Sequence, residues 1–424
     1  MRPGYKQTEV GVIPESWDVI PIGMAGEVLG GRQRSPHYVG ERSKYLRVAN
    51  VFDGFINTDD VLEMPFSPAE KQRFQLRDGD ILLNEGQSIE LIGRSAIYRG
   101  KPDNCCFQNT LLRFRAASCT CPEFAQVVFQ QYLRTGVFAS IALQTTSIAH
   151  LGAGRLAALK MSLPPKSEQK TIAEALSDAD VLIESLEQLI AKKRQIKQGA
   201  MQELFTGKKR LPGFSGEWRM KTLGDLFSFS GGFTASRDQL STDGHCYLHY
   251  GDIHTSNKTF IDVRSEYQEI PKLDIPLKRV STVSLLDDGD VVFVDASEDA
   301  EGASKHVVIV NPDKTPFIAG LHTIVAKSET NELDHRYRRY SFQTPAVKAQ
   351  FRFFAVGTKV SGISKTNIAK ITLPLPSVPE QTAIAEILSD VDAEIAALET
   401  KLAKARQIKQ GMMQELLTGR IRLV

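Results

Sequence analysis

The stretch EQKTIAEALSDAD at Glu168–Asp180 returns as EQTAIAEILSDVD at Glu380–Asp392. The run RQIKQGAMQELFTG at Arg194–Gly207 returns as RQIKQGMMQELLTG at Arg406–Gly419, again 212 positions later and without a gap. Over the 44 positions that begin at Glu168, 28 are identical between the two copies. A fixed period of half the chain identifies an internal duplication.

Each copy carries an apolar seam with alternating steps of four and three residues, which predicts a long helix. The seam residues are Ile172, Leu176, Ala179, Ile183, Leu186 and Ile190 in the first copy, and Ile384, Leu388, Val391, Ile395, Leu398 and Leu402 in the second. Prolines precede both copies, so Ser167 and Ser377 are the expected N-caps, and Ser377 with Glu380 fits a capping box. Gly207 and Gly419 are the expected C-terminal caps. Each helix then has about 38 residues and a length of roughly 57 Å.

The best available cover for each apolar seam is the seam of the other copy, which predicts a coiled coil. A strict seam would bury Lys193, Lys197 and Lys409, so we expect the buried face to shift toward Ile196 and Ile408.

A glycine follows these isoleucines within one helical turn in each copy, at Gly199 and Gly411. Because mid-helix glycine costs about 1 kcal/mol, this pair predicts a close approach or a bend.

The sequence before each helix is doubled more faintly. Trp17 matches Trp218 at an offset of 201, and the DGD at Asp78–Asp80 matches Asp288–Asp290 at an offset of 210. Short apolar runs between turn residues predict strands in DGDILLNEG, GRSAIYRG, TLLRFRA, DGDVVFVDAS, KHVVIVNPD and LHTIVAK, and CPEFAQVVFQQYLRTG predicts a helix. The fold class is therefore α+β (mixed), with two mixed α/β domains that alternate with two long helices.

Composition leaves the partner open. The 424 residues, 42% of them hydrophobic, allow two to four domains, and the formal net charge of +2 is too small to indicate nucleic acid by itself. No apolar run approaches the roughly 18 residues of a membrane span, so we expect a soluble, cytoplasmic protein. Five cysteines without a CxxC pair favour reduced, structural thiols.

Several identities between the helices are polar and lie off the seam. They predict one kind of partner docked twice, around a pseudo-two-fold axis, although a solvated face is the simpler alternative. The expected docking residues are Gln169, Glu174, Arg194, Gln195, Gln381, Glu386, Arg406 and Gln407. Domains that repeat a scaffold while varying their loops suit the recognition of two different targets, such as two DNA half-sites.

The chain resembles the specificity (S) subunit of type I restriction-modification systems, the HsdS family. The resemblance rests on the tandem order, the LPxP segments at Leu373–Pro376 and, loosely, Leu163–Pro165, the Glu-Gln pairs that follow them, and the two tryptophan domain starts. It implies target-recognition domains at 1–163 and 208–375 and spacer helices at 164–207 and 376–424, with the helices packed as an antiparallel coiled coil.

The resemblance further implies that the domains read the two halves of a bipartite, asymmetric site in double-stranded DNA. It implies docking of two methyltransferase (M) subunits on the helices, and restriction/translocase (R) subunits in the complete complex. That complex would be an adenine-N6 DNA methyltransferase and a type I site-specific deoxyribonuclease. S-adenosylmethionine, ATP and Mg²⁺ are expected only on the partner subunits.

The sequence indicates no catalysis by this chain. FSGGF at Phe229–Phe233 has the wrong spacing for an S-adenosylmethionine loop, NPD at Asn311–Asp313 lacks the second proline of a methyltransferase motif, and Gly207-Lys208-Lys209 is not a phosphate-binding loop. His245, Cys246, His249 and His254 match no standard metal spacing, so no metal is expected.

DNA-contacting residues are expected among polar and basic side chains in turn-rich segments, because such side chains read base edges and hold phosphates. A plain surface role is an equal alternative for each residue. The candidates are Arg32, Arg34, Asn84, Gln87, Arg94, Asn109, Thr146 and Ser147 in the first domain, and Arg237, Ser297, Glu298, Lys305, His306, His322, Lys359 and Ser361 in the second.

The expected function is that of a non-catalytic DNA-specificity subunit. Two alternatives stay open: a coiled-coil scaffold with protein-binding domains, and an orphan specificity subunit that lacks its enzymes.

Overall fold

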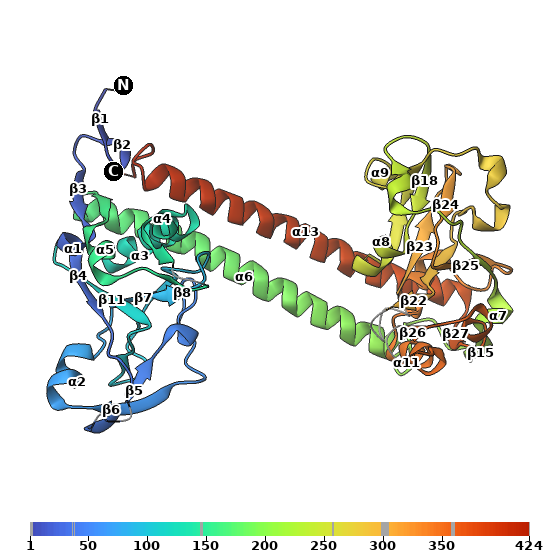
Figure 1. Ribbon diagram of the computed structural model, residues 1–424. Coiled ribbons are helices and arrows are strands. Elements are labelled where there is room, and N and C mark those ends of the chain that lie inside the picture. The colour runs from blue at the N-terminus through green and yellow to red at the C-terminus, as the bar shows by residue number, and fades with distance from the viewer. Residues whose placement is uncertain are drawn as a thin grey trace. The chain divides into compact units, whose positions relative to one another are not determined.

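The computed structural model describes residues 3–35, 37, 39–144, 147–256, 258–297, 305–357 and 361–423. The chain divides into two compact units. Unit 1 contains Met1–Glu187 and Thr400–Val424, and unit 2 contains Gln188–Glu399. Each unit therefore combines one α/β domain with one segment of each long helix (Figure 1).

The long helices are α6, Lys166–Leu204, and α13, Val378–Leu416, with 39 residues each. These lengths confirm the predicted helices. Gly207 and Gly419 have φ of 66° and 65°, the left-handed conformation expected of C-terminal caps. Because α6 begins at Lys166, the prediction of Ser167 as an N-cap is wrong. None of the described helices is long and apolar enough to cross a membrane.

In unit 1, ion pairs fix the direction of the two helix segments. Asp180 contacts Lys409 at 2.5 Å, and Glu187 contacts Arg406 at 2.5 Å. As residue numbers rise along α6, those of the partners fall along α13. The segments are therefore antiparallel, as predicted (Figure 1).

Unit 2 repeats both pairs with the helices exchanged. Asp392 contacts Lys197 at 2.6 Å, and Glu399 contacts Arg194 at 2.6 Å. Adding 212 to each carboxylate of unit 1, and subtracting 212 from each cation, gives these four residues. The duplication therefore extends to individual interhelical contacts.

The lysines of the seam are accommodated by charge pairing. Lys197 and Lys409 keep only 20% and 17% of their side chains exposed, and each meets a carboxylate. Ile196 and Ile408 are 48% and 51% exposed, so the predicted shift of the buried face toward them is wrong. The physical reason is that a paired ammonium can remain at a helix interface while its aliphatic stem packs there.

Gly199 and Gly411 lie inside the continuous helices, and a Cβ added at either glycine would meet nothing within 4 Å. Of the two predicted alternatives, a close approach or a bend, the close approach is therefore wrong. We have no structural account of why both positions are glycine.

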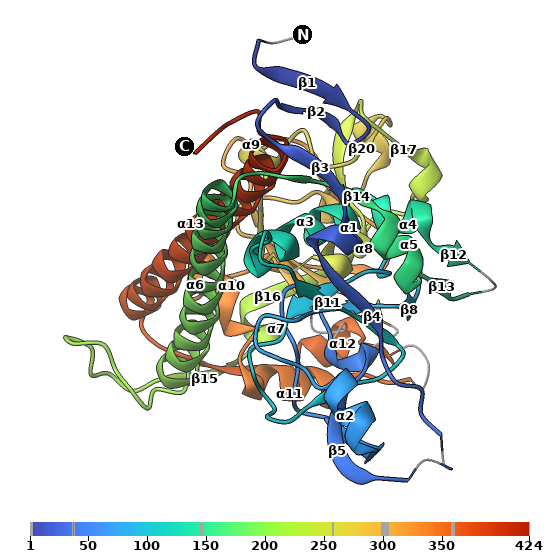
Figure 2. The same cartoon turned by 90° about the vertical axis from the view of Figure 1, so that its left-hand side faces the viewer.

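The core of unit 1 lies on a four-stranded antiparallel sheet of order β4-β11-β7-β9. A second sheet, β10-β5-β6, and a small sheet, β12-β13-β8, adjoin it, and Figure 2 shows β8, β12 and β13 together at one edge of the unit. The strands are β4 Gly26–Gly30, β5 Glu41–Leu46, β6 Leu62–Phe66, β7 Ile81–Asn84, β8 Gly86–Gln87, β9 Ser95–Ile97, β10 Cys106–Phe107, β11 Leu111–Ala116, β12 Leu143–Gln144 and β13 Ala149–His150. The main helices are α2 Pro68–Phe74, α3 Pro122–Arg134, α4 Val137–Ile141 and α5 Ala153–Ala158.

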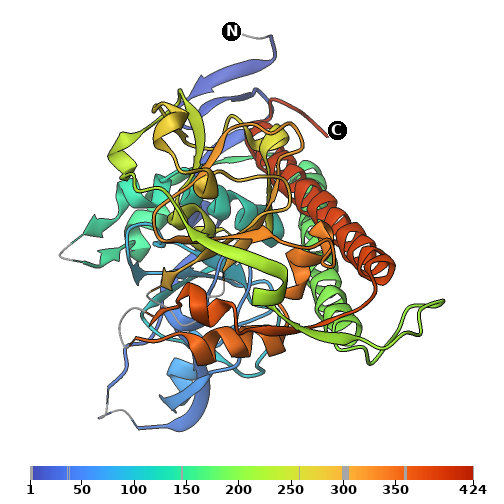
Figure 3. The same cartoon turned by 90° about the vertical axis from the view of Figure 1, so that its right-hand side faces the viewer.

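Unit 2, turned toward the viewer in Figure 3, repeats this plan with a five-stranded sheet of order β16-β25-β21-β23-β19. A second sheet has the order β17-β20-β18-β24, and β22 pairs with β26. The strands are β16 Phe227–Gly231, β17 Leu240–Ser241, β18 His245–Leu248, β19 Phe260–Asp262, β20 Lys272–Leu273, β21 Val291–Val294, β22 Ala296–Ser297, β23 His306–Val310, β24 Phe317–Ala319, β25 Thr323–Ser328 and β26 Ser361–Gly362. The main helices are α8 Tyr250–Thr255, α9 Val263–Glu266, α10 His335–Ser341, α11 Pro345–Phe354 and α12 Lys365–Ile368.

The two central sheets share their register. Gly30 pairs with Leu112 in unit 1, and Gly231 pairs with Ile324 in unit 2, at the duplication offsets of 201 and 212. All six segments predicted as strands contain one, and the predicted helix is α3. The mixed α+β fold is confirmed.

One more strand pair closes each domain before its helix. In unit 1, β3 (Asp18–Pro21) pairs with β14 (Lys160–Leu163), and in unit 2, β15 (Arg219–Thr222) pairs with β27 (Thr372–Leu375). The LPxP segments lie on or directly after β14 and β27. The chain therefore passes from a paired strand straight into each long helix.

Candidate nucleic-acid interface

The candidates of unit 1 gather where β7 ends. The backbone amide of Asn84 donates a hydrogen bond to the Arg94 carbonyl at 2.9 Å, and the backbone amide of Asn109 donates one to the Arg32 carbonyl at 3.0 Å. Gln87 lies on β8, which follows β7 directly. These segments from four parts of the chain meet at one end of the central sheet, which we call the reading end of unit 1.

Two backbone hydrogen bonds of unit 1 recur at the reading end of unit 2. The Val294 amide donates to the Lys305 carbonyl at 3.0 Å, as the matching Asn84 amide donates to Arg94. The Asp295 amide donates to the His322 carbonyl at 3.2 Å, as the matching Glu85 amide donates to the Thr110 carbonyl at 3.0 Å. Ser297 of β22 pairs with Ser361 of β26, as Gln87 pairs with Ala149 in unit 1. Among the candidates, Arg94 and Lys305 therefore occupy matching places, as do Gln87 and Ser297.

Exposure divides the candidates. Arg34, Asn109, Ser147, Arg237 and His322 are exposed, and Gln87, Arg94, Lys305 and Ser361 are partly exposed. Arg32, Asn84, Ser297 and His306 are buried, which argues against the direct DNA contact predicted for these four. Thr146, Glu298 and Lys359 lie outside the described residues.

Arg32 shows why some candidates are buried. Its guanidinium forms two bonds with the Glu70 carboxylate, at 2.8 and 2.9 Å, and lies over the ring of Phe66. The hydrogen bond from Arg32 is the largest cause that lowers the pKa of Glu70 to about 2. Arg32 therefore ties α2 to the sheet. His306 is similarly occupied, packed against the rings of Phe293 and Phe342.

A carboxylate-histidine pair at each reading end was missed by sequence reasoning. Glu85 Oε2 lies 3.2 Å from His150 Nδ1 in unit 1, and Asp295 Oδ1 lies 3.4 Å from His322 Nδ1 in unit 2. Glu85 and Asp295 match at the offset of 210, but the histidines come from different strands or turns. Matched acidic residues near the ends of two segments predicted as strands were the available signal.

An aromatic cluster surrounds His322 in unit 2. Tyr250 lies edge-on to His322 with 5.4 Å between ring centroids, and His249 lies 4.5 Å from Tyr250. Arg237 contacts His249 at 3.4 Å and Asp252 at 3.6 Å. Burial, followed by the positive charge of Arg237, lowers the pKa of His249. The cluster offers ring faces and hydrogen-bonding groups together.

The helix residues expected to dock partners also divide. Gln169 and Gln381 are 1% and 0% exposed, so an outward-facing role is wrong for both. Each side chain forms hydrogen bonds with the loop that precedes a domain helix. Gln169 contacts the backbone of Cys119 and Cys121, and Gln381 contacts the backbone of Glu332 and Asp334. Glu174, Arg194, Gln195, Glu386, Arg406 and Gln407 are exposed.

A buried glutamate joins each domain to both helices of its unit. Glu168 is 1% exposed, accepts a hydrogen bond from Trp17 Nε1 at 3.0 Å and forms an ion pair with Arg422. Glu380, also 1% exposed, accepts equivalent bonds from Trp218 at 3.2 Å and Arg210 at 2.6 Å. The repeated tryptophan, glutamate and arginine were visible in sequence, but only packing reveals that they meet.

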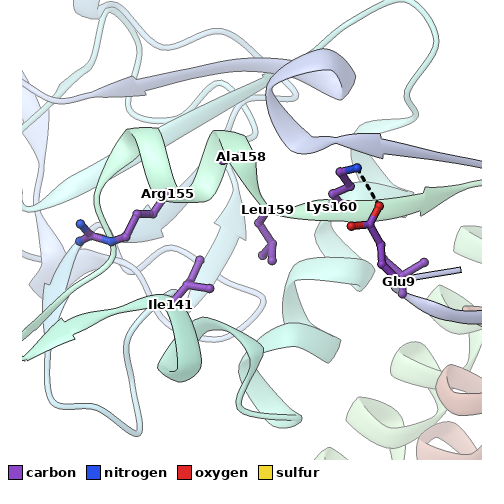
Figure 4. A pocket seen from close by; sticks show the side chains of 7 residues that line it. Glu9, Ile141, Arg155, Ala158, Leu159 and Lys160 are labelled. Atoms are coloured by element: carbon purple, nitrogen blue, oxygen red, sulfur yellow. Dashed lines mark ion pairs between the residues drawn. The ribbon is translucent and has the colours of Figure 1, made fainter.

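The described residues contain no group of three or more histidine, cysteine or acidic side chains that could hold a metal ion. A pocket of about 580 Å³ in unit 1 is lined by Ile141, Leu159 and Arg155, and the Lys160 ammonium at its edge is paired with Glu9 at 2.7 Å (Figure 4). Its lining contains no serine, cysteine or histidine.

Comparison with known proteins agrees with this geometry. A protein of Methanocaldococcus jannaschii that carries the name of a type I restriction enzyme MjaX specificity subunit is 26% identical over 438 residues, covering 99% of this chain and 97% of its own. The type I restriction enzyme MjaVIII specificity subunit of the same organism is 22% identical and covers 97% of this chain and 94% of its own.

The crystal structure of a type I restriction-modification system S subunit from M. genitalium superposes with a TM-score of 0.56 at 15% identity. It covers 98% of this chain and 99% of its own, which shows a shared fold. The family profile described as type I restriction modification DNA specificity domain matches residues 54–196 and 215–407. Because these matches span most of both halves, the chain belongs to the type I restriction modification DNA specificity domain family.

Proposed function

We propose that this chain is the non-catalytic DNA-specificity subunit of a type I restriction-modification complex. Each domain reads one half of a bipartite, asymmetric site in double-stranded DNA through its reading end. The long helices set the distance between the half-sites and dock two methyltransferase subunits. The complete complex adds restriction/translocase subunits.

One observation supports the proposal most strongly: two reading ends with the same backbone bonds but different side chains. Thr110 stands directly before β11, where His322 stands directly before β25, and their carbonyls accept matching bonds from Glu85 and Asp295. A threonine side chain offers one hydroxyl, whereas a histidine side chain offers two ring nitrogens, so the two carry different patterns of donors and acceptors. One scaffold with two sets of readers suits an asymmetric site.

In this proposal the partner subunits bind the cofactors and carry out the catalytic steps. S-adenosylmethionine would bind to the methyltransferase subunits, and ATP and Mg²⁺ would bind to the partner subunits of the complete complex. On the helices, Glu174 and Glu386 are matched, exposed and 212 positions apart, so they suit two copies of one partner.

The test is sequence preference in the assembled complex. We would purify the chain with a neighbouring methyltransferase subunit and measure its binding to a library of random bipartite duplexes. We expect a preferred split site, with affinity that falls steeply as salt rises because phosphate contacts release counterions. A complex without any sequence preference, or a chain that binds only proteins, would contradict the proposal.

The spacer role has a separate test. Adding seven helical residues after Gln188 in α6 and seven after Thr400 in α13 lengthens both helices by about 10.5 Å while the ion pairs on either side stay in register. This length corresponds to about three base pairs. We expect the accepted gap between half-sites to grow by that number. An unchanged gap would remove the helices from the measuring role.

A further inference from the structure

Unit 1 presents a stacked pair of aromatic rings at a tight turn. Val51 and Ile56 form a bridge, and the Phe52 amide donates to the Phe55 carbonyl at 3.0 Å. The rings of Phe52 and Phe55 are 4.9 Å apart and only 7° from parallel. Phe55 is 57% exposed. A large apolar ring in water is unfavourable, so its contribution to folding does not explain its position.

The turn is held from several sides. The Gly54 amide donates to the Ser95 carbonyl at 2.9 Å, and Gln130 donates to the Asp53 carboxylate at 3.0 Å. Val51, at the base of the turn, is fully buried. Because these contacts restrict the backbone, a ligand that binds Phe55 would meet a ring that is already ordered, which lowers the entropic cost of binding.

The ring pair lies at the reading end of unit 1. The Arg94 guanidinium lies 5.6 Å from the centroid of the Phe52 ring. Arg94 also precedes Ser95, to which the turn is bonded, and its carbonyl accepts the bond from Asn84. The exposed ring and a positive charge therefore stand together beside the segments expected to meet DNA.

Unit 2 uses the matching stretch differently. After the strand that matches β5, its chain forms α8, and the side chains at its reading end are His249, Tyr250 and His322. These rings carry polar groups, whereas Phe52 and Phe55 carry none. The difference between the units is therefore one of chemistry as well as of shape.

We propose that Phe55, backed by Phe52, stacks on a nucleobase in the half-site read by unit 1 and separates that base from its neighbour. The inference rests on the proposed function and specifies how unit 1 engages duplex DNA. A phenylalanine ring can stack on any base, and apolar side chains open base steps in this way in other DNA-binding proteins. Arg94 supplies the adjacent positive charge that the phosphate backbone requires.

The test uses the complex with its methyltransferase subunit and duplexes that carry its mapped site. 2-Aminopurine is placed in turn at each base of the first half-site, because its fluorescence rises when stacking is lost. We expect a rise at one base other than the methylated adenine. Phe55→Ala should abolish that rise, leave any signal at the methylated adenine, and weaken binding by about tenfold.

Phe353→Ala is the matched control. Phe353 is 81% exposed and also belongs to an aromatic pair, with the Phe354 ring 5.1 Å away in unit 2. We expect this variant to keep the wild-type affinity and fluorescence. Because both phenylalanines are exposed, both variants should keep the wild-type thermal unfolding midpoint.

Unchanged affinity and fluorescence in Phe55→Ala would overturn the inference. A variant that no longer co-purifies with the methyltransferase subunit would overturn it as well, because the ring would then contact protein. Failure of the proposed function would look different: the wild-type complex itself would show no preferred site, and the inference would fall with it.

Discussion

The reading ends of units 1 and 2 share backbone bonds and strand register, yet their side chains differ. Glu85 and Asp295 occupy the same place, but one meets His150 and the other meets His322. The helices behave in the opposite way, since Asp180–Lys409 and Asp392–Lys197 repeat side chain for side chain. The duplication has thus kept contacts between the helices and varied the side chains at the reading ends.

The largest effect should come from the buried glutamates that join each domain to the helices. Removing one partner of a buried ion pair costs about 3–5 kcal/mol, because the other charge stays desolvated. We expect Glu168→Ala and Glu380→Ala to lose similar amounts in urea unfolding. The two tryptophans of the chain, Trp17 and Trp218, report on one unit each. A loss below about 1 kcal/mol, as for a surface pair, would contradict this account.

Substitutions at the two helix caps should differ in how much they lower stability. Alanine in the left-handed conformation costs about 1–2 kcal/mol, so both Gly207→Ala and Gly419→Ala should destabilise. A Cβ at Gly419 would also stand 2.5 Å from Pro14, whereas at Gly207 its nearest neighbour is Trp218 at 3.8 Å. We expect Gly419→Ala to have the lower thermal midpoint. Equal midpoints would show that Pro14 yields without cost.

Acid should loosen unit 1 through Glu70. The pKa of its carboxyl is about 2 in the folded chain and 4.5 ordinarily, so its stabilising contribution is complete above pH 4.5. That contribution is lost as pH falls from 4.5 toward 2. We expect the urea midpoints of wild type and Glu70→Gln to converge over this range. In unit 2, the residue that matches Arg32 at the offset of 201 is Phe233, so a pair of this kind is not repeated there. A constant difference between the midpoints would contradict the assignment.

The smallest effect should come from the interhelical pairs. Lys409→Ala and Lys197→Ala each remove a partly exposed ion pair, worth about 0.2–1 kcal/mol. We expect both losses to shrink in high salt, measured as changes in urea midpoint. The loss should be somewhat larger for Lys197→Ala, because the Lys197 ammonium also lies 5.3 Å from the centroid of the Tyr340 ring. A larger loss for Lys409→Ala would contradict this account.

Much of the fold could be predicted from sequence because periodicity and turn chemistry are local. The seams, the glycines at 207 and 419 and the strand runs all formed as predicted. Lys197 and Lys409 were misjudged because their partners, Asp392 and Asp180, lie on the other helix, and only the antiparallel register brings them together.

The candidate site was harder to predict for the same reason. Residue type and turn position selected Arg94, Asn109 and His322 at the reading ends. They could not show that Arg32 is occupied by Glu70 or that Asn84 is fully buried, because burial depends on distant segments. Phe55 was missed because an isolated phenylalanine gives no sign of exposure.

The central claim is that two matched reading ends recognise different half-sites independently. Genome-wide mapping of methylated adenines tests it directly, in cells that express the methyltransferase with Asn109→Ala or His322→Ala. We predict that Asn109→Ala relaxes recognition in one half of the site only, and that His322→Ala relaxes it in the other half only. Variants that alter the same half, or both halves together, would contradict the account.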